Sequence, residues 1–426
     1  MESSLLNRHP KGLYLLFFVE MWERFSYYGM RALIVLYMIQ ELAYSAQRAG
    51  NIYGLYTGFV YLTPLLGGYL ADRYIGQRRC ITAGAVFMSL GLFLLGFGPK
   101  SLFLLSLFLM IIANGFFKSN ISSVLGLLYC DNDAKKDSAF TVFYMGINLG
   151  AFLSPLICGT LAVKFGFEYG FAAAGVGMLA GLFMYKIFEN KLLGECGKFP
   201  VKIKDKAETS SDNITEQEKD KFKALIMLMI FTVPFWVCFE QAGSSLTLFA
   251  EYSVNRKIFG IEIPTEYFQS LNPLFIIALA PIISILWDKL RKIGKEPTSV
   301  EKFSMALGIM AAAYVLLSYA GHCASNSLVS PLWLVAGYFV MTVAELCISP
   351  IGLSLVSKLA PPQFLSLLMG CWFFTNFSGN LIAGYIGGKY ETVPSYILFG
   401  ILSFLAFITF IAIIIFRRRI NKLIGN

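Results

Sequence analysis

Charged residues are scarce in this sequence. Asp, Glu, Lys and Arg make up 14% of its 426 residues, whereas 57% of the residues are apolar. Soluble globular domains carry about 25% charged residues, so the composition excludes an ordinary soluble fold. It is typical of a protein that crosses a membrane many times.

Side chains that commonly perform chemistry are also few. The two histidines, His9 and His322, fall in predicted tail or loop positions, and the eight cysteines are scattered without paired spacing. We therefore expect no disulfide framework, no metal site and no cofactor. The HExxH and GxSxG motifs are missing, so an enzyme is not expected. Any proton that crosses the membrane through this chain must be carried by carboxylates.

Apolar runs of about 20 residues, the length that a helix needs to cross a bilayer, recur along the whole chain. They predict an all-α polytopic membrane protein with twelve transmembrane helices. The predicted spans are 13–39, 51–71, 80–98, 101–129, 138–161, 169–189, 223–250, 267–287, 303–320, 331–357, 364–388 and 393–416.

The basic residues predict the orientation in the membrane. Glu20, Glu23 and Arg24 interrupt the first apolar run, whereas a cleaved signal peptide needs an unbroken one. Most of the 35 Lys and Arg residues fall in loops on the side of both termini, which predicts that both termini are cytoplasmic. We expect an integral protein of the bacterial inner membrane. The net charge of +9 and the Arg417–Arg419 tail indicate contact with membrane lipid rather than nucleic acid.

A polar segment at 190–222 divides the chain into an N-terminal six-helix bundle, 1–189, and a C-terminal six-helix bundle, 223–426. Its composition predicts a flexible or locally helical cytoplasmic linker. The loops ADRYIGQRR (71–79) and WDKLRKIGK (287–295) resemble one another. They are either parts of an internal repeat, as in many secondary transporters, or two ordinary basic loops. The stretch GGYLADRYIGQRR resembles the loop signature of the major facilitator superfamily.

The first span carries a stripe of charge in the stretch EMWERFSYYGMR. At roughly 100° per residue, Glu20, Arg24, Tyr27 and Arg31 fall on one helix face with Glu23 beside them. A charge at mid-membrane costs about 3 kcal/mol on insertion scales, so these side chains need partners or a wet cavity. The stripe is either a structural lattice of ion pairs or part of a substrate or ion pathway.

Three more charges lie inside predicted spans: Lys118, Glu240 and Glu345. The pathway interpretation is favoured because four acids and three bases could then surround one cavity. Burial raises the pKa of a glutamate and a nearby cation lowers it, so an exchange of partner becomes an exchange of proton. Asn148 and Asn272 add neutral polar positions within spans, although such residues also serve helix packing.

Six motifs resemble, in the right order, those of the proton-dependent oligopeptide transporters, a branch of the major facilitator superfamily. They are EMWERFSYYG, FYMGINLGAF, FEQAGSS, FQSLNPLF, AELCISPIGLS and WFFTNFSGN. The resemblance covers nearly the whole chain. It implies symport of protons with di- and tripeptides by alternating access of the two bundles.

The resemblance also implies roles for residues. The expected proton-coupling residues are Glu20, Glu23, Arg24, Lys118 and Glu240, and the expected outer gate is the pair Arg31 and Glu240. Lys118 and Arg31 would bind the peptide carboxylate, and Glu345 with Asn148 and Asn272 would bind its amino terminus. The expected side-chain pockets are lined by Tyr27, Tyr28, Tyr61 and Trp372.

Two features depart from the family pattern. The linker is too short and too polar to hold the two additional helices of many bacterial members, so we expect a twelve-helix form. Ser119 follows Lys118 where the family usually has proline, which puts the local helix geometry in question.

Other functions are compatible with the same fold. The chain could carry an amino-acid-like compound or nitrate, or exchange protons for drugs. Glu345 argues against nitrate, because a small anion needs no carboxylate to receive an ammonium group. A channel is disfavoured because the charges have mixed signs and are spread over several helices instead of ringing a pore.

Overall fold

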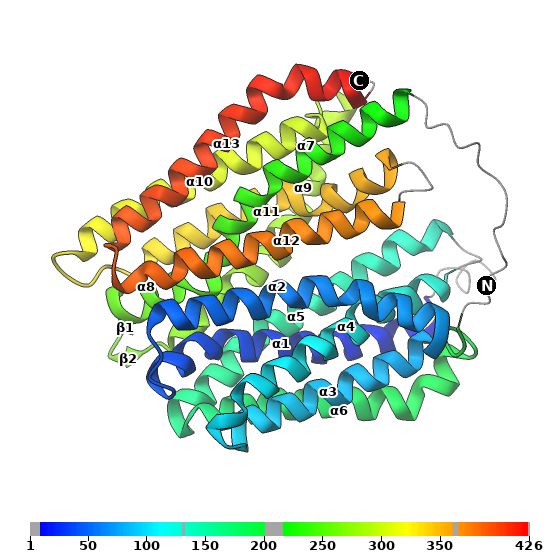
Figure 1. The fold of residues 1–426 in the computed structure, drawn as a ribbon, viewed down its shortest axis with the longest axis horizontal. Helices are drawn as coiled ribbons and strands as arrows, with labels where there is room; N and C mark the ends of the chain where they lie inside the picture. The colour runs from blue at the N-terminus through cyan, green and yellow to red at the C-terminus, as the bar shows by residue number, and fades with distance from the viewer. Residues whose placement is uncertain (1–8, 130–132, 201–215, 361–364, 425–426) are drawn as a thin grey trace. The chain divides into compact units, whose positions relative to one another are not determined.

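A computed structural model of the chain describes residues 9–129, 133–200, 216–360 and 365–424, almost all of them helical. Contacts divide the chain into two compact units (Figure 1). The predicted domain boundaries at 189 and 223 stay a prediction. Part of the predicted linker, 201–215, lies outside the described residues.

The first unit consists of Met1–Ile34 and Leu62–Lys206. It holds α1 (Lys11–Gln40) up to Ile34 and the end of α2 (Ala46–Leu70), followed by η2 (Ala71–Ile75), α3 (Gln77–Phe97), η3 (Lys100–Leu102), α4 (Phe103–Leu127), α5 (Asp133–Phe165) and α6 (Phe167–Leu193). Helix α3 packs against α4 and α6, and α5 packs against α6. Helix α4 continues without a break through Ser119.

The second unit consists of Val35–Tyr61 and Ala207–Asn426. After the end of α1 and most of α2 it holds α7 (Glu216–Phe239), η4 (Glu240–Gly243), α8 (Ser245–Ser253), β1 (Lys257–Ile258), β2 (Ile261–Glu262), η5 (Thr265–Ser270), α9 (Leu271–Lys292), α10 (Ser299–Ala324), α11 (Leu332–Leu359), α12 (Leu365–Gly387), η7 (Gly388–Glu391) and α13 (Ser395–Ile424). Helix α10 packs against α11 and α13, and α7 packs against α12 and α13. Because α10 extends to Ala324, His322 lies in its last turn and not in a loop as expected.

The helices confirm the predicted fold class. Within the described ranges, nine helices are long and apolar enough to cross a membrane, and α7, η4 and α8 count among them as one stretch, Gln217–Ser253. Helices α1, α2 and α12 are not among the nine. The charges of α1 lower its hydropathy, although it is 30 residues long and has the predicted position. That all twelve helical segments cross the membrane stays a prediction.

The two similar basic loops each contain a glycine in the left-handed region. Gly76 follows η2 with a φ of 88°, and Gly294 follows α9 with a φ of 67°. Glu296 follows Gly294 and binds a cation on each side of the loop. Its carboxylate oxygens lie 2.7 Å from Nε of Arg291 in α9 and 2.7 Å from Nζ of Lys302 in α10. These hydrogen bonds, with that from Arg291 the stronger influence, lower the pKa of Glu296 to about 2. The loop is thereby fastened to both α9 and α10.

Part of α2 packs closely against α12 through glycines. A Cβ at Gly54 would lie 2.7 Å from the carbonyl oxygen of Asn380 and 3.0 Å from the Cα of Gly384. Gly50 lies one turn earlier and meets Gly384 and Gly388 in the same way. Small residues four apart allow two membrane helices to approach at backbone distance. This contact explains why residues 35–61 group with the second unit.

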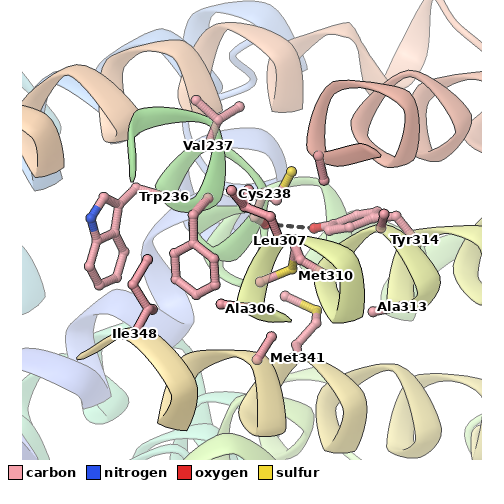
Figure 2. Close-up of a cluster of buried hydrophobic side chains, with 14 of the residues drawn as sticks. Trp236, Val237, Cys238, Ala306, Leu307, Met310, Ala313, Tyr314, Met341 and Ile348 are labelled. Carbon is pink, nitrogen blue, oxygen red and sulfur yellow. Dashed lines mark hydrogen bonds between the residues drawn. The ribbon is translucent and has the colours of Figure 1, made fainter. Parts of the chain in front are cut away.

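The core of the second unit lies between α7, α10 and α11 (Figure 2). Apolar side chains from the three helices meet there, including Leu307, Met310 and Met341, which are at most 1% exposed. Helix α7, which forms one side of this core, ends at Phe239 and continues directly as the 3₁₀ turn η4. A break of this kind frees backbone carbonyls that need other donors.

Two tyrosines supply hydrogen bonds at this break. The Tyr314 hydroxyl donates to the carbonyl of Cys238 at 2.6 Å, drawn as a dashed line in Figure 2. The Tyr338 hydroxyl donates to the carbonyl of Ala242 at 3.3 Å. Both tyrosines are buried. The break is therefore held by side-chain hydrogen bonds within the core and is not a frayed helix end.

We expect Tyr314→Phe to destabilise the protein, because it leaves the buried Cys238 carbonyl without this donor. An unsatisfied buried group costs about 1–3 kcal/mol. The change should appear as a lower melting temperature of purified protein in detergent. Tyr319→Phe, at a side chain that is 57% exposed, is the matched control and should melt like the wild type. Equal melting of both variants would contradict the role given to the Tyr314 hydroxyl.

Candidate functional site

The charged stripe of α1 forms a compact cluster in the first unit. The Nε atom of Arg24 lies 2.8 Å from Oε1 of Glu20 and 2.7 Å from Oε2 of Glu23. All three side chains are at most 4% exposed. One guanidinium therefore lies between two buried carboxylates that are less than one turn apart on the same helix.

Several polar atoms of this cluster are buried without a hydrogen bond to any described residue. They are Oε2 of Glu20, both carboxylate oxygens of Glu23 and Nη2 of Arg24. The contact between Arg24 and Glu23 is thus an ion pair whose geometry falls short of a hydrogen bond. Buried polar groups are nearly always paired, so a cluster with several unsatisfied atoms suggests a functional site.

Lys118 of α4 completes the charge balance. It lies close enough to Glu23 to attract its carboxylate electrostatically. The side chain is half-buried on a helix that is otherwise strongly apolar. The structure thus brings Lys118 close to Glu20, Glu23 and Arg24, which lie nearly a hundred positions earlier in the sequence. Their predicted role in proton coupling stays a prediction.

Helix α5 covers the cluster from another side. A Cβ at Gly146 would lie 2.9 Å from the carbonyl oxygen of Phe17, and one at Gly150 would lie 3.1 Å from the Cβ of Arg24. Asn148 stands between these glycines and is buried. Its side-chain amide donates to the carbonyl of Tyr144 in its own helix at 2.9 Å. The motif FYMGINLGAF therefore provides close helix contact as well as a polar side chain.

Aromatic rings line the next turns of α1. The rings of Tyr27 and Tyr28 are 5.1 Å apart and nearly perpendicular. The guanidinium of Arg24 lies 5.8 Å from the centre of the Tyr27 ring, and that of Arg31 lies 5.8 Å from the centre of the Tyr28 ring. Each arginine thus has an aromatic face beside it, which stabilises a cation in an apolar setting.

The second unit holds a separate polar group on α9 and α11. The side-chain amide of Asn272 donates to Oε2 of Glu345 at 2.8 Å and reaches the hydroxyl oxygen of Thr342 at 3.1 Å. Glu345 and Asn272 are only half-buried, unlike the glutamates of α1. The structure therefore joins two of the three residues expected to bind a peptide amino terminus. The third, Asn148, belongs to the first unit.

Glu240 is the first residue of η4 and is 1% exposed. Its neighbour Gln241 fastens the break: the amide donates to the carbonyl of Ala383 in α12 at 3.1 Å, and the amide oxygen accepts a hydrogen bond from Ser245 at 2.6 Å. The predicted gate joins Arg31 of the first unit to Glu240 of the second, and it stays a prediction.

The remaining expected pocket residues are Tyr61 and Trp372, both in the second unit. Tyr61 is half-buried in the second half of α2. Trp372 is 4% exposed, lies against the backbone of Gly352 in α11 and packs edge-on against Phe303 at 6.3 Å. It thus has a packing role in the core of the second unit, whatever it contributes to a pocket.

Sequence reasoning did not single out Gln241, Thr342 or Tyr314 as parts of these sites. Gln241 stands inside the motif FEQAGSS, next to the charge that drew attention to Glu240. Thr342 precedes Glu345 by three residues, hence on the same helix face. Among the described residues there is no group of three His, Cys, Asp or Glu side chains that could hold a metal ion.

A model of the POT family matches residues 78–191 and 189–397, which is more than half of the chain. The chain belongs to the POT family, the proton-dependent oligopeptide transporters. The fold expected from the motifs, that of the major facilitator superfamily, is thereby confirmed. The family consists of transporters, which points away from an enzyme.

Three POT relatives illustrate the likeness. The peptide transporter YePEPT of Yersinia enterocolitica is 34% identical over 448 residues, which cover 89% of this chain and 88% of the relative. The di-/tripeptide transporter of Lactococcus lactis subsp. cremoris is 31% identical over 484 residues, covering 98% and 97%. A crystal structure of a POT family transporter in complex with 5-aminolevulinic acid matches with a TM-score of 0.90 at 31% identity, covering 97% of each chain.

We expect Arg24→Gln to destabilise this POT member strongly at neutral pH, because it leaves two buried carboxylates without their shared cation. Removing one partner of a buried ion pair costs about 3–5 kcal/mol. Acidification should recover part of the loss, since protonated glutamates no longer repel one another. Melting temperatures in detergent at neutral and acidic pH measure both effects. Arg48→Gln, at an exposed side chain, is the control, and an unchanged melting temperature of Arg24→Gln would refute the expectation.

Proposed function

We propose that the chain is a proton-coupled symporter of di- and tripeptides that works by alternating access. The observation that carries the proposal is the buried cluster on α1, where one guanidinium lies between two carboxylates. The names of relatives that match most of the chain, a peptide transporter and a di-/tripeptide transporter, support the substrate class.

Proton coupling follows from the shortage of cations in this cluster. Arg24 can neutralise one carboxylate fully, while the second needs either a proton or the more distant Lys118. When a proton binds to Glu20 or Glu23, Lys118 is released to attract another anion. When that anion leaves, Lys118 returns to the carboxylate and favours loss of the proton. Proton binding and anion binding thereby favour each other.

A peptide provides the anion and a cation at fixed separation. In the proposal its carboxylate is attracted by Lys118 and Arg31, and its ammonium group by Glu345. Support comes from the hydrogen bond between Asn272 and Glu345, which fixes the carboxylate of Glu345 while leaving it half-buried. Asn148 would add a polar contact. Because recognition would rest on the two ends of the peptide, the identity of its side chains would have little influence on binding.

Peptide side chains would then lie against aromatic walls and water. Tyr27, Tyr28, Tyr61 and Trp372 are the residues we assign to these pockets. Aromatic faces accept apolar, polar and cationic side chains, and bridging water adapts to the rest. Broad acceptance of peptide sequences follows from this arrangement.

Alternating access requires helices that can bend and contacts that can open. The interruption of α7 at η4 and the glycine contact between α2 and α12 support such movement. We assign the outer gate to Arg31 and Glu240. Proton binding to Glu240 would neutralise the pair and allow the gate to open. We assign the protein to the bacterial inner membrane, with membrane lipid around its helices. Both termini and the linker would then lie in the cytoplasm.

A second substrate class has its own support. A POT family transporter at 31% identity was crystallised with 5-aminolevulinic acid, an amino-acid-like compound. Such a compound carries the same two charged ends as a peptide, so the residues assigned above could bind it. Competition between this compound and dialanine for uptake measures how the chain ranks the two.

Uptake by proteoliposomes tests the proposal directly. With the outside made acidic, the wild type should accumulate labelled dialanine and trialanine, and a protonophore should abolish accumulation. Glu345→Gln should reduce uptake at least tenfold, because the peptide ammonium loses its charged partner. Glu168→Gln, at an exposed carboxylate of α6, is the control and should leave uptake unchanged. Folded wild-type protein without uptake would refute peptide transport.

Counterflow separates proton coupling from peptide binding. We expect Glu20→Gln or Glu23→Gln to abolish accumulation driven by a pH gradient while exchange of labelled for unlabelled peptide continues, because exchange needs no net proton movement. Initial rates of both reactions, measured in the same proteoliposomes, provide the test. The proton-coupling role would be wrong if both variants kept the pH dependence of the wild type.

A further inference from the structure

A pocket of about 380 Å³ lies at one end of the first unit, where α3 begins and α6 ends. We call it the α3–α6 pocket. Its lining includes Arg78 and Arg79 of α3, Lys186, Glu189 and Asn190 of α6, and Lys198 in the turns that follow α6. The lining holds four cationic side chains and one carboxylate, and with Glu195, which pairs with Lys198, the formal excess is two positive charges.

Arg78 holds the frame of the pocket together. Its side chain is buried and binds three partners from the end of α6: Glu189 at 3.2 Å, the carbonyl of Gly194 at 2.7 Å and the amide oxygen of Asn190 at 2.6 Å. The backbone N–H of Arg78 donates to the carbonyl of Gly197 at 2.9 Å. These contacts fix the start of α3 against the end of α6 and engage each of the three nitrogens of the Arg78 guanidinium.

The other three cations remain accessible at the rim. Arg79 is exposed, the side chain of Lys186 is 50% exposed and that of Lys198 is 43% exposed. Lys186 binds Glu189, and Lys198 binds Glu195 at 2.9 Å. Each lysine has further donors, because an ammonium group carries three. The rim therefore presents converging donors with net positive charge to an outside anion.

The surroundings of the pocket are apolar on the membrane side. Helices α3 and α6 are both candidate membrane spans. On α6, Phe183 precedes Lys186 by about one turn toward the membrane interior and is 70% exposed, and Ile187 next to Lys186 is 53% exposed. Phe199 is 60% exposed, and the Lys198 ammonium lies 5.5 Å from the centre of its ring. Positive charge and exposed apolar surface thus adjoin at the ends of two candidate membrane spans.

We propose that the α3–α6 pocket binds an anionic glycerophospholipid of the cytoplasmic leaflet. The phosphate is held by Arg79, Lys186 and Lys198, and the acyl chains run along Phe183 and Ile187. A basic pocket between transmembrane helices suits such a headgroup, and each nearby cation adds to its binding. A free phosphate ion shares the headgroup chemistry but makes no use of the apolar side. The site lies outside the residues assigned to peptide and protons, so it is independent of the transport proposal.

Native mass spectrometry of the delipidated full chain in detergent provides the test. Phosphatidylglycerol is the anionic probe, phosphatidylcholine the neutral one, and inorganic phosphate the headgroup chemistry alone. The variant Arg79→Gln, Lys186→Gln removes two rim cations and leaves Arg78 in place. Its matched control is Lys292→Gln, Lys295→Gln, which removes two exposed cations at the end of α9 and in the loop that follows, on the same predicted membrane face.

We expect the wild type to bind phosphatidylglycerol more tightly than phosphatidylcholine. The rim variant should weaken phosphatidylglycerol binding by about fivefold for each cation removed, whereas the loop variant keeps wild-type affinity. Melting temperatures in lipid-free detergent verify that both variants are folded. Equal affinity of the rim variant and the wild type overturns the proposal. So does full displacement of phosphatidylglycerol by millimolar inorganic phosphate, which identifies the site as a free-phosphate site.

Discussion

The contact of Arg24 with Glu20 and Glu23 determines much of the first unit. Each charge taken into the membrane interior costs about 3 kcal/mol unless it finds a partner, so a helix that carries four charges needs partners along its charged face. The structure meets this requirement by burying the cluster and by bringing Lys118 of α4 close to it. Helix α5 approaches through Gly146 and Gly150, since any larger side chain there would collide with the α1 backbone or Arg24.

The second unit solves a similar problem with backbone groups. Glu240 stands where α7 turns into η4, so a buried carboxylate and a helix break occupy the same place. The freed carbonyls are satisfied by Tyr314 and Tyr338, and Gln241 ties the break to α12. A break held by these hydrogen bonds is stable in one geometry and still bends more readily than a continuous helix. The unit thereby combines a firm core with a point at which one helix can change direction.

The sequence predicted the features that are local or periodic. The apolar runs located the helices, and the spacing of Glu20, Glu23 and Arg24 placed them on one face because three or four residues make one turn. The break at Glu240 escaped prediction, because the proline of α7, Pro234, lies six residues before it and the break depends on tyrosines more than 70 residues away. The contact of Gly54 with Gly384 joins segments more than 300 residues apart. Nothing in the sequence around either glycine indicates that the other is its contact.

The α1 cluster has two carboxylates but one guanidinium, and this inequality bears on the choice between a structural lattice of ion pairs and a substrate or ion pathway. A lattice that served stability alone would do as well with apolar side chains, since replacing a buried ion pair by well-packed hydrophobic residues is often neutral or stabilising. It would also pair its charges completely. This cluster leaves Oε2 of Glu20 and Nη2 of Arg24 without hydrogen bonds to described residues, and it sets two carboxylates against one guanidinium. Such an arrangement costs stability wherever no proton or second cation is present. This cost favours the pathway interpretation over a purely structural lattice.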